Sequence, residues 1–295
     1  MEKGGTALIS VIMVTFQSMQ VLSWCLESLE KCSSSNELEI WMVDNHSQDG
    51  TWEWLERYTK GKYNKPFADI HLLRLNDNMG YAYANNIALK RARGDYFLLL
   101  NPDTLVSENA IQVCVEKIKS DPSIGAITCR LQLGNGEMDN ACHRSFPTLW
   151  NSFSYFSGLS KAFPQSSTFS GYQLTYLEKS GSYPVDAISG AFLMLTKVVY
   201  DTIGGLDEDY FMYGEDIDYC YQLKRKGFLV WYEGSVTTIH FKGGNGGKKS
   251  KASLKHFYES MIIFLQKNYK EYYPIWLIQL MTIIIKFIYF IKLNE

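Results

Sequence analysis

Short apolar runs alternate with segments of helical character along the N-terminal part of the chain, and this alternation constrains the fold more than any other feature. Buried strands are predicted for the runs at 8–15, 39–43, 70–75 and 96–100. Helices are predicted between them, at 18–31, about 50–58 and 81–93. Strands and helices that alternate over short connections build a parallel sheet covered by helices. The sequence therefore predicts an α/β fold with a mostly parallel central sheet.

The pattern loosens in the second half of the chain. A helix at 107–119 and a strand at 124–129 extend the alternation, whereas 134–184 is rich in Ser, Gly, Phe and Tyr with weak periodicity. We interpret this stretch as an irregular insertion whose loops could bind a ligand. Regular structure is predicted to resume with strands at 187–196, 228–232 and 235–239 and helices at 197–203 and 215–226.

Charge is distributed unevenly along the chain. Residues 241–295 hold nine Lys and three Glu, a net charge of +6, so the remainder carries -8 of the total of -2. An acidic body argues against nucleic-acid binding. A basic segment that is also apolar is typical of contact with anionic lipid, although a solvated basic helix would have the same composition.

The cysteines and the N-terminus predict a cytoplasmic protein. None of the six cysteines has Cys-x-x-Cys spacing, which indicates thiols of a reducing compartment and neither a disulfide framework nor a zinc site. The first apolar run, 8–15, is too short and too β-branched for a secretion signal.

The run at 96–100 ends in Asn101-Pro102-Asp103, which presents a carboxylate where a strand gives way to a loop. Ligands of open α/β sheets bind beyond the carboxyl ends of the strands, and a carboxylate there can hold a divalent metal that clamps a diphosphate. Pro102 ends the strand sharply. The alternative is an ordinary turn, because the same triplet is common in turns.

Two other polar motifs follow predicted strands. Asp44 ends the run at 39–43 and could accept hydrogen bonds from a nucleobase or a ribose, or it could cap the following helix. The segment from Asn78 through Gly80 to Asn85 opens a helix with small residues, which permits close approach of an anionic ligand to free N–H groups. An ordinary capped helix N-terminus would have the same sequence pattern.

Three carboxylates stand within four residues at Glu215, Asp216 and Asp218. Like charges this close repel, and burial would raise the pKa of at least one of them, as a general base requires. The dipole of a helix also favours acids in its first turn. His240 precedes the Gly-rich stretch 243–247 and could be a metal ligand or a structural histidine.

Taken together, these motifs resemble the inverting glycosyltransferases of family 2, which have the Rossmann-like GT-A fold. Among them, the likeness is greatest to rhamnosyltransferase-like members that build bacterial surface polysaccharides. It extends from about residue 8 to residue 265. The matching segments are Val14-Thr15-Phe16, Val43-Asp44-Asn45, Asn78-Met79-Gly80, Asn85-Asn86, Leu100-Asn101-Pro102-Asp103, Ser189-Gly190-Ala191, Gly205-Leu206-Asp207-Glu208, Tyr213-Gly214-Glu215-Asp216-Ile217-Asp218 and His240.

The resemblance implies a role for each part of the chain. Residues 1–250 would form the catalytic domain, with a nucleotide-sugar-binding half at 1–130 and an acceptor-binding half at 131–250, and 251–295 would be a basic and apolar helical region. The enzyme would move a rhamnose or similar sugar from a dTDP- or UDP-linked donor to a saccharide, expected to be lipid-linked, during synthesis of an O-antigen or a capsule.

It also implies a role for individual residues. Asp216 would deprotonate the acceptor hydroxyl, and Asp103 and His240 would bind Mg²⁺ or Mn²⁺. The donor would contact Thr15, Phe16, Asp44, Asn78, Gly80, Asn85, Asn101 and Asp103. The acceptor would contact Gly190, Ala191 and Glu215.

Two positions depart from the family pattern. Asn101 stands where Asp is common, and Phe16-Gln17 stands where Tyr-Asn is common. Asn is a neutral metal ligand, so a relative that binds nucleotide-sugar or glycan without catalysis is the alternative function. A nucleotidyltransferase would want a basic, Gly-rich loop after the first strand, which 16–19 is not. The Asn-Pro-Asp form is familiar among rhamnosyltransferase-like members and favours a dTDP-linked deoxysugar.

The tail ends in an apolar stretch, 275–291, interrupted by Gln279, Thr282 and Lys286. As a helix it would span about 26 Å, short of the roughly 30 Å hydrocarbon core of a bilayer. The sequence predicts a helix in the interface, making peripheral contact with the cytoplasmic face of the plasma membrane, and removal of residues after Tyr269 should then free the protein from membranes. A tilted span and packing against the body are the alternatives.

Overall fold

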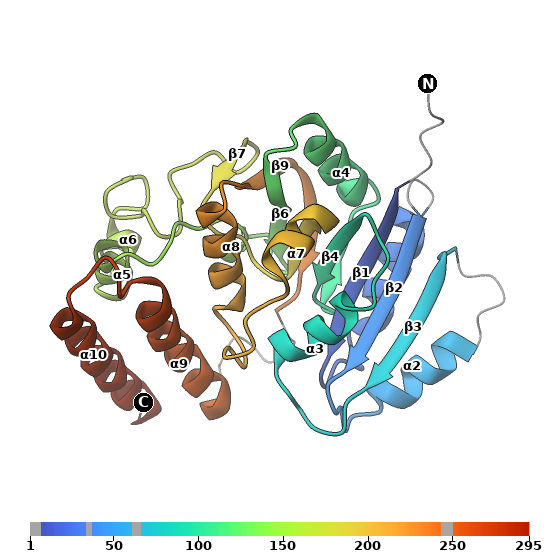
Figure 1. Cartoon of the computed structure of the whole chain (residues 1–295), viewed down its shortest axis with the longest axis horizontal. Helices are drawn as coiled ribbons and strands as arrows, with labels where there is room; N and C mark the ends of the chain where they lie inside the picture. The colour runs from blue at the N-terminus through green and yellow to red at the C-terminus, as the bar shows by residue number, and fades with distance from the viewer. Residues whose placement is uncertain (1–6, 34–36, 61–65, 243–249, 295) are drawn as a thin grey trace.

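The computed structural model describes residues 7–33, 37–60, 66–242 and 250–294. Within these ranges the chain forms a nine-stranded mixed sheet flanked by helices (Figure 1). The strand order is β3-β2-β1-β4-β8-β6-β9-β5, and β7 pairs with β9. The α/β prediction is therefore confirmed.

The N-terminal half is the parallel, helix-covered unit that the apolar pattern predicts. Its strands are β1 (Leu8–Thr15), β2 (Glu37–Asp44), β3 (Asp69–Arg74) and β4 (Tyr96–Leu100). All three pairings among them are parallel. The helices here are α1 (Leu22–Cys32), α2 (Thr51–Lys60), α3 (Tyr81–Leu89) and α4 (Ala110–Ser120). The helix predicted at 81–93 ends early, because the backbone N–H and the guanidinium of Arg93 both donate to the buried carboxylate of Glu39.

The second half of the sheet is mixed. Its strands are β5 (Thr104–Leu105), β6 (Ile124–Leu133), β7 (Ser182–Val185), β8 (Phe192–Thr196) and β9 (Leu229–His240). Strand β8 runs antiparallel to both β4 and β6, so parallel pairing does not extend across the sheet. The strands predicted at 228–232 and 235–239 are one strand, β9, because a bulge opposite Cys129 and Arg130 absorbs the break between them.

The stretch 134–184 is largely irregular, as predicted, but it also contains helices. These are the 3₁₀ turn η1 (Asn140–Cys142), α5 (Leu149–Phe156) and α6 (Leu159–Ala162). Thr148 caps α5 by accepting a hydrogen bond from the backbone N–H of Asn151 at 3.2 Å. The helices α7 (Lys197–Ile203) and α8 (Glu215–Arg225) match their predicted ranges closely.

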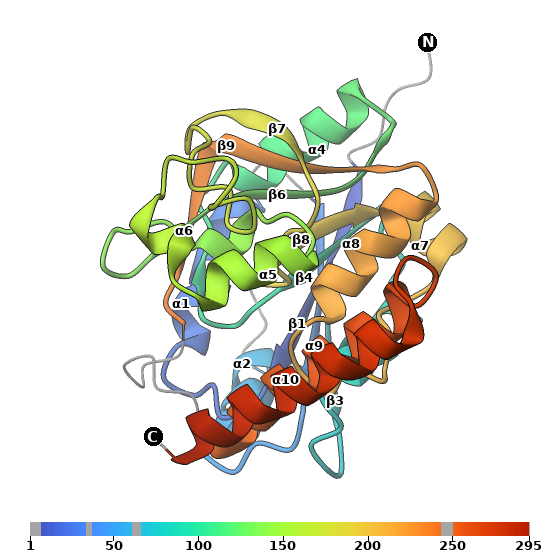
Figure 2. The same ribbon diagram turned by 90° about the vertical axis from the view of Figure 1, so that its left-hand side faces the viewer.

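The C-terminal region is a helical hairpin docked on the body. Its helices α9 (Lys251–Asn268) and α10 (Ile275–Asn294) lie side by side in both views (Figures 1 and 2). Tyr221 of α8 packs against Phe264 of α9, and the cluster continues to Ile278 and Ile285 of α10. One face of α10 therefore covers the protein, which is one of the alternatives that the sequence left open.

Candidate functional site

A cavity of about 1450 Å³ opens at the carboxyl ends of β1, β2 and β4. It is the place that an open α/β sheet provides for a ligand. Most of the predicted site residues line it, namely Phe16, Asn78, Gly80, Asn101, Asp103, Gly190, Ala191, Glu215, Asp216 and His240. The polar residues at one end and the acidic residues of α8 thus face the same space.

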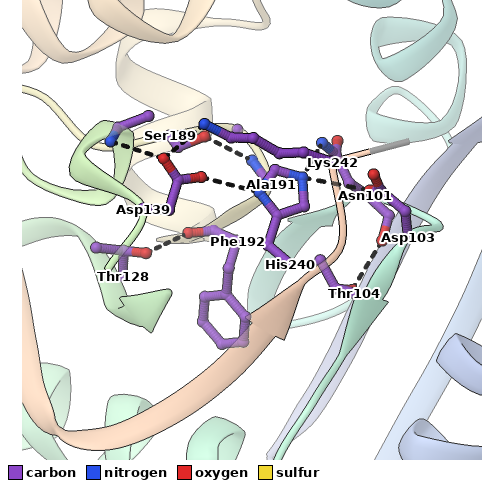
Figure 3. Close-up of polar contacts among 12 residues, drawn as sticks. Asn101, Asp103, Thr104, Thr128, Asp139, Ser189, Ala191, Phe192, His240 and Lys242 are labelled. Carbon is purple, nitrogen blue, oxygen red and sulfur yellow. Dashed lines mark hydrogen bonds and ion pairs between the residues drawn. The ribbon is translucent and has the colours of Figure 1, made fainter. Parts of the chain in front are cut away.

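Asp103 and His240 meet at one corner of the cavity because β5 pairs with β9. The antiparallel register places Thr104 opposite His240, so the residue before Thr104 lies beside the imidazole. The distance from His240 Nε2 to Asp103 Oδ1 is 3.3 Å, and that to Asn101 Nδ2 is 3.4 Å. Figure 3 shows the imidazole between this pair and Asp139.

Asp139 holds the other edge of the imidazole. Its Oδ2 lies 3.0 Å from His240 Nδ1, and its Oδ1 accepts from Lys242 Nζ at 2.7 Å. Burial alone would lower the pKa of His240, but hydrogen bonds and charges from Asp103 and Asp139 outweigh it and raise the pKa to about 9. Burial would raise the pKa of Asp139, yet its bonds to His240 and Lys242 hold that pKa well below its usual range.

The carboxylate and imidazole side chains of this corner are suitable ligands for a divalent cation. Without a metal, both ring nitrogens of His240 face carboxylates, Nδ1 that of Asp139 and Nε2 that of Asp103. A cation that displaced the Nε2 proton would gain the Nε2 lone pair as a ligand while Nδ1–H still donates to Asp139, and a carboxylate behind a ligating histidine is the common outer-shell arrangement of metal sites. Two donors on neighbouring positions of an octahedral ion are about 3 Å apart, close to the observed separation. Among the residues that the structure describes, no cluster of three or more His, Cys, Asp or Glu side chains forms a complete protein cage. Asp103 and His240 alone would leave positions for phosphate oxygens, as Mg²⁺ sites usually do.

The floor of the polar end is built from two loops that follow β2 and β3. Asn45 Nδ2 donates to Asn78 Oδ1 at 2.8 Å, and Asn45 Oδ1 accepts from the backbone N–H of Met79 at 2.9 Å. Gly80 has a φ of 89°, and a Cβ there would lie 2.5 Å from the carbonyl oxygen of Phe211. Only glycine fits at that point, where the polar end of the cavity meets the segment leading to α8.

Three of the predicted donor residues lie outside the cavity lining. Thr15 Oγ1 donates to Asp44 Oδ1 at 3.1 Å, and both side chains are fully buried. The Asp44 carboxylate also accepts from the backbone N–H of Ser47 at 3.1 Å, so it holds the loop after β1 against the loop after β2. Asn85 is buried within α3, where its Nδ2 donates to the carbonyl of Tyr81. Contact of Thr15, Asp44 or Asn85 with a donor stays a prediction.

The acidic corner is organised by a guanidinium. Arg144 Nη2 donates to Asp216 Oδ2 at 2.7 Å, and the backbone N–H of Gly190 donates to the same oxygen at 3.3 Å. The other oxygen, Oδ1, accepts from the backbone N–H of Ile217 at 2.8 Å. The carboxylate is thereby fixed in one orientation in the cavity wall.

Glu215 and Asp218 are the buried carboxyls of the acidic group, and Glu215 is the one that lines the cavity. Its Oε2 has no hydrogen-bond partner among the described residues. Burial and the neighbouring charge of Asp216 raise its pKa to about 8, which confirms the predicted shift. The residues leading into it, Tyr213 and Gly214, have φ angles of 69° and 83°, a conformation that costs energy at the tyrosine. Asp218 instead bonds Asn268 and Tyr210, which gives it a structural role between α8 and α9.

We expect the pKa of Glu215 to make stability fall as pH rises. Between the ordinary value of 4.5 and about 8, the unfolded chain releases a proton that the folded chain keeps. Glu215→Gln removes this linkage, so its Tm should exceed that of the wild type by several degrees, up to about 10 °C, at high pH and match it at low pH. Thermal unfolding at pH 4.5 and 8.5 measures the difference, with exposed Glu116→Gln as the control. A difference that does not change with pH would contradict the assignment.

The sequence pattern gave Lys242 a role, as one of three Lys in a Gly-rich segment that could close over phosphates, but it gave no functional role to Asn45, Asp139 or Arg144. Asp139 and Arg144 lie in the irregular stretch, and their partners are 101 and 72 residues away along the chain. Their only local signal was charge in a segment rich in apolar and small residues. The Gly-rich stretch 243–247 lies outside the described residues.

Known proteins share both the sequence pattern and the fold. The chain is 25% identical over 280 residues to an N-acetylglucosaminyl-diphospho-decaprenol L-rhamnosyltransferase of Mycobacterium tuberculosis, covering 91% of this chain and 87% of the relative. It is 25% identical over 236 residues to the low-salt glycan biosynthesis hexosyltransferase Agl10 of Haloferax volcanii, covering 79% of this chain and 66% of the relative.

Structural comparison gives the same fold. The mannosyltransferase PcManGT from Pyrobaculum calidifontis, in complex with GDP-Man and Mn²⁺, has a TM-score of 0.61 at 16% sequence identity. The match covers 90% of this chain and 64% of that one, and it shows a GT-A-like architecture. A model of the glycosyl transferase family 2 matches residues 10–181, which is more than half of the chain. The chain therefore belongs to glycosyl transferase family 2.

Proposed function

We propose that this protein transfers a sugar from a nucleotide-sugar to a hydroxyl of a lipid-linked saccharide, with inversion at the anomeric carbon. One observation carries the proposal: the Asp103–His240 corner and the Asp216 carboxylate line the same cavity. A transferase needs both, because one end must hold a diphosphate leaving group and the other must accept a proton.

The donor would lie at the polar end of the cavity, with its diphosphate next to Asp103 and His240. A Mg²⁺ or Mn²⁺ ion bound there would neutralise charge on the leaving diphosphate. Asn101, Asn78 and Gly80 line this end and are suited to the nucleotide and the sugar. The M. tuberculosis relative, an L-rhamnosyltransferase aligned over most of both chains, supports a rhamnose-like sugar. The proposed donor carries this sugar on dTDP or UDP.

Asp216 would act as the general base. Its carboxylate takes the proton of the acceptor hydroxyl, the hydroxyl oxygen forms a bond to the anomeric carbon, and the bond from that carbon to the diphosphate oxygen breaks. Arg144 and the N–H of Gly190 keep the carboxylate oriented for that transfer. The unpartnered Oε2 of Glu215, with Gly190 and Ala191, offers polar contacts to the acceptor saccharide. A binding protein without catalysis would have no use for a carboxylate held in this way.

The proposed membrane location, and with it a lipid-linked acceptor, rest on the composition and packing of α10. Residues 275–293 are long and apolar enough to cross a membrane by length and composition, with a mean hydropathy of 1.8 and 11% of the segment buried. The helix has 20 residues and so measures about 30 Å, longer than the stretch predicted from sequence. It packs along α9, whose Lys255, Glu259 and Lys267 are exposed, and a spanning α10 would draw these charges into hydrocarbon. We therefore place α10 in the interface at the cytoplasmic face of the plasma membrane.

The outer face of α10 is expected to carry the membrane affinity. Phe287 and Phe290 are 62% and 64% exposed, so Phe287→Ser with Phe290→Ser removes apolar contact without opening the core. We expect the partition constant of the double variant on anionic phospholipid vesicles to be lower than that of the wild type by about tenfold or more. Sedimentation with the vesicles measures it, and exposed Val198→Ser on α7 is the control. Equal partition of the double variant and the wild type would contradict the placement.

Removal of everything after Tyr269 is a less specific test than the sequence suggests. The truncation would also uncover the surface of α9 against which Ile278 and Ile285 pack. Loss of membrane binding by a truncated protein would then combine a missing contact with a destabilised hairpin.

Calorimetric titration of the full chain with dTDP and with UDP, each with and without Mn²⁺, tests the proposed function. We expect one nucleotide to bind in a Mn²⁺-dependent manner, and the preferred base then identifies the donor class. Failure of both nucleotides to bind in the presence of Mn²⁺ would contradict a dTDP- or UDP-linked donor.

A further inference from the structure

The cavity does not end at Asp216 but continues into an apolar chamber. The chamber walls come from α5, α9 and α10, which neighbour one another on the side of the molecule away from β3 (Figures 1 and 2). Its lining includes Leu149 and Phe156 of α5, Met261 and Phe264 of α9, and Ile284 and Ile288 of α10. One continuous space thus joins the catalytic carboxylate to a surface made of hydrocarbon side chains.

The chamber begins directly beside the acidic corner because α9 packs against the segment that enters α8. A Cβ on Gly214 would lie 3.0 Å from Cβ of Ser260, so the helix and the loop are in contact there. The ring of Tyr213 lies edge-on to that of Phe257 with centroids 6.0 Å apart, and Phe211 stacks on His256 at 4.4 Å. A ligand that leaves Asp216 on this side meets α9 at once.

The chemistry of the walls selects the kind of ligand. Among the described residues of α5, α9 and α10, none that lines the cavity is charged, and the polar ones are the hydroxyl residues Ser152, Tyr155, Ser253, Tyr258 and Ser260. A sugar needs hydrogen-bond partners along its length, and the Leu, Phe, Met and Ile side chains between these hydroxyls supply none, so burying a saccharide there is costly. A hydrocarbon chain has no such requirement and gains free energy from the same burial.

The chamber also reaches the surface next to the exposed face of α10. Ile284 lines the cavity and is 39% exposed, and Phe156 on the facing wall is 40% exposed, so both lie at the rim. Beyond the rim lie the exposed aromatic side chains of α10. A chain held in the chamber can therefore continue into the lipid phase without crossing water.

No segment that the structure describes fills this space. The parts of the sequence outside the described residues, 1–6, 34–36, 61–65, 243–249 and 295, are polar or rich in Gly and Lys, a composition that does not match hydrocarbon walls. An occupant must place a hydroxyl at Asp216 and hydrocarbon further along the cavity, which is the shape of an amphiphile with a saccharide head.

We propose that the chamber between α5, α9 and α10 binds the hydrocarbon chain of the acceptor lipid, next to the saccharide that reacts at Asp216. This assignment rests on the proposed function and deepens it, because it makes the lipid a part of the recognised substrate. Membrane contact through the outer face of α10 and chain binding through its inner rim are then separate properties of one helix.

Direct binding of a chain-bearing probe tests the assignment without any transfer reaction. The probe is geranylgeranyl diphosphate below its micellar concentration, with inorganic diphosphate as the chainless comparison, and no vesicles are present. The variant is Ile284→Asn with Phe156→Asn, which changes the two residues that face each other across the rim of the chamber. Ile283→Asn is the matched control, because this neighbouring isoleucine is 64% exposed and does not line the cavity.

We expect the double variant to weaken binding of the probe by about tenfold or more, and the control to stay within about twofold of the wild type. Thermal unfolding of each variant checks that the fold is kept. Absence of probe binding to the wild type, or equal binding by the double variant and the control, would overturn the assignment.

A transfer assay separates this inference from the proposed function. The acceptors are N-acetylglucosaminyl diphosphates that carry either a methyl group or a geranylgeranyl chain. We expect kcat/KM to be at least about tenfold higher for the long chain, and the double variant to lose that preference. Transfer that ignores chain length overturns the chamber assignment and leaves the transferase standing. Failure of dTDP and UDP to bind with Mn²⁺ contradicts the proposed donor class, and probe binding alone then decides the chamber.

Discussion

Asp216→Asn is expected to lower kcat by about a thousandfold while donor affinity stays within about twofold of the wild type. The amide keeps the shape of the side chain and can still face Arg144, but it cannot take the proton of an acceptor hydroxyl. Single-turnover transfer measures the rate, and calorimetric binding of the nucleotide with Mn²⁺ measures the affinity. The split between the two identifies a residue that acts on the reaction and not on the donor.

Asp218→Asn provides the matched control for this prediction. Asp218 lies two positions away in the same helical turn, but its carboxylate bonds Asn268 at 2.6 Å and Tyr210 at 3.2 Å. We expect this variant to lower Tm and to leave kcat within a few-fold of the wild type. If Asp216→Asn reduced donor binding and Tm together with kcat, its role would be structural and the base would have to be sought elsewhere.

Asp103→Ala is expected to have the second largest effect, on nucleotide binding. The variant removes the anionic half of the Asp103–His240 corner, so the Mn²⁺-dependent part of the affinity should fall by about a hundredfold, whereas metal-free binding should hardly change. Titration of the nucleotide with and without Mn²⁺ gives both numbers. Asp201→Ala is the control, because that carboxylate pairs with Lys197 on the surface.

Asp139→Asn should have an intermediate effect in the same titration. It keeps the side-chain volume behind the imidazole but weakens the hold on His240 Nδ1, so its loss of Mn²⁺-dependent affinity should lie between the wild type and Asp103→Ala. An Asp103→Ala variant with unchanged affinity would remove Asp103 from the metal site. The neutral Asn101 at the same corner makes this measurement informative, because it leaves Asp103 as the anionic group nearest His240 Nε2 at the end of β4.

These variants address different free energies. Asp216 is proposed to act only as the new bond forms, so its loss should appear in kcat. Asp103 and His240 are proposed to hold the donor before and during reaction, so their loss should appear in affinity as well. The chamber residues are proposed to act on the acceptor alone, and their loss should appear only when the acceptor carries a chain.

The sequence by itself determined the local helices and strands and the strand ends that carry candidate site residues. The run at 96–100 is β4 residue for residue, and the carboxylate that follows it lines the cavity, as predicted. Apolar periodicity and strand-ending residues are local properties, because a period of two or 3.6 and a proline turn need only neighbouring residues to be expressed. The acidic group in the first turn of α8 was visible for the same reason.

Only the tertiary structure decided which of these residues meet. Asp139 and Arg144 reach His240 and Asp216 across the fold, and β8 runs antiparallel between β4 and β6. The predicted donor residue Asp44 turned out to be fully buried, bonded to Thr15 and Ser47. Such pairings depend on how layers pack and on which strand edges are free, and no window of neighbouring residues contains that information. The apolar C-terminal stretch shows the same division, since its composition predicts a surface for lipid, whereas its packing on α9 makes one side of it a wall of the cavity.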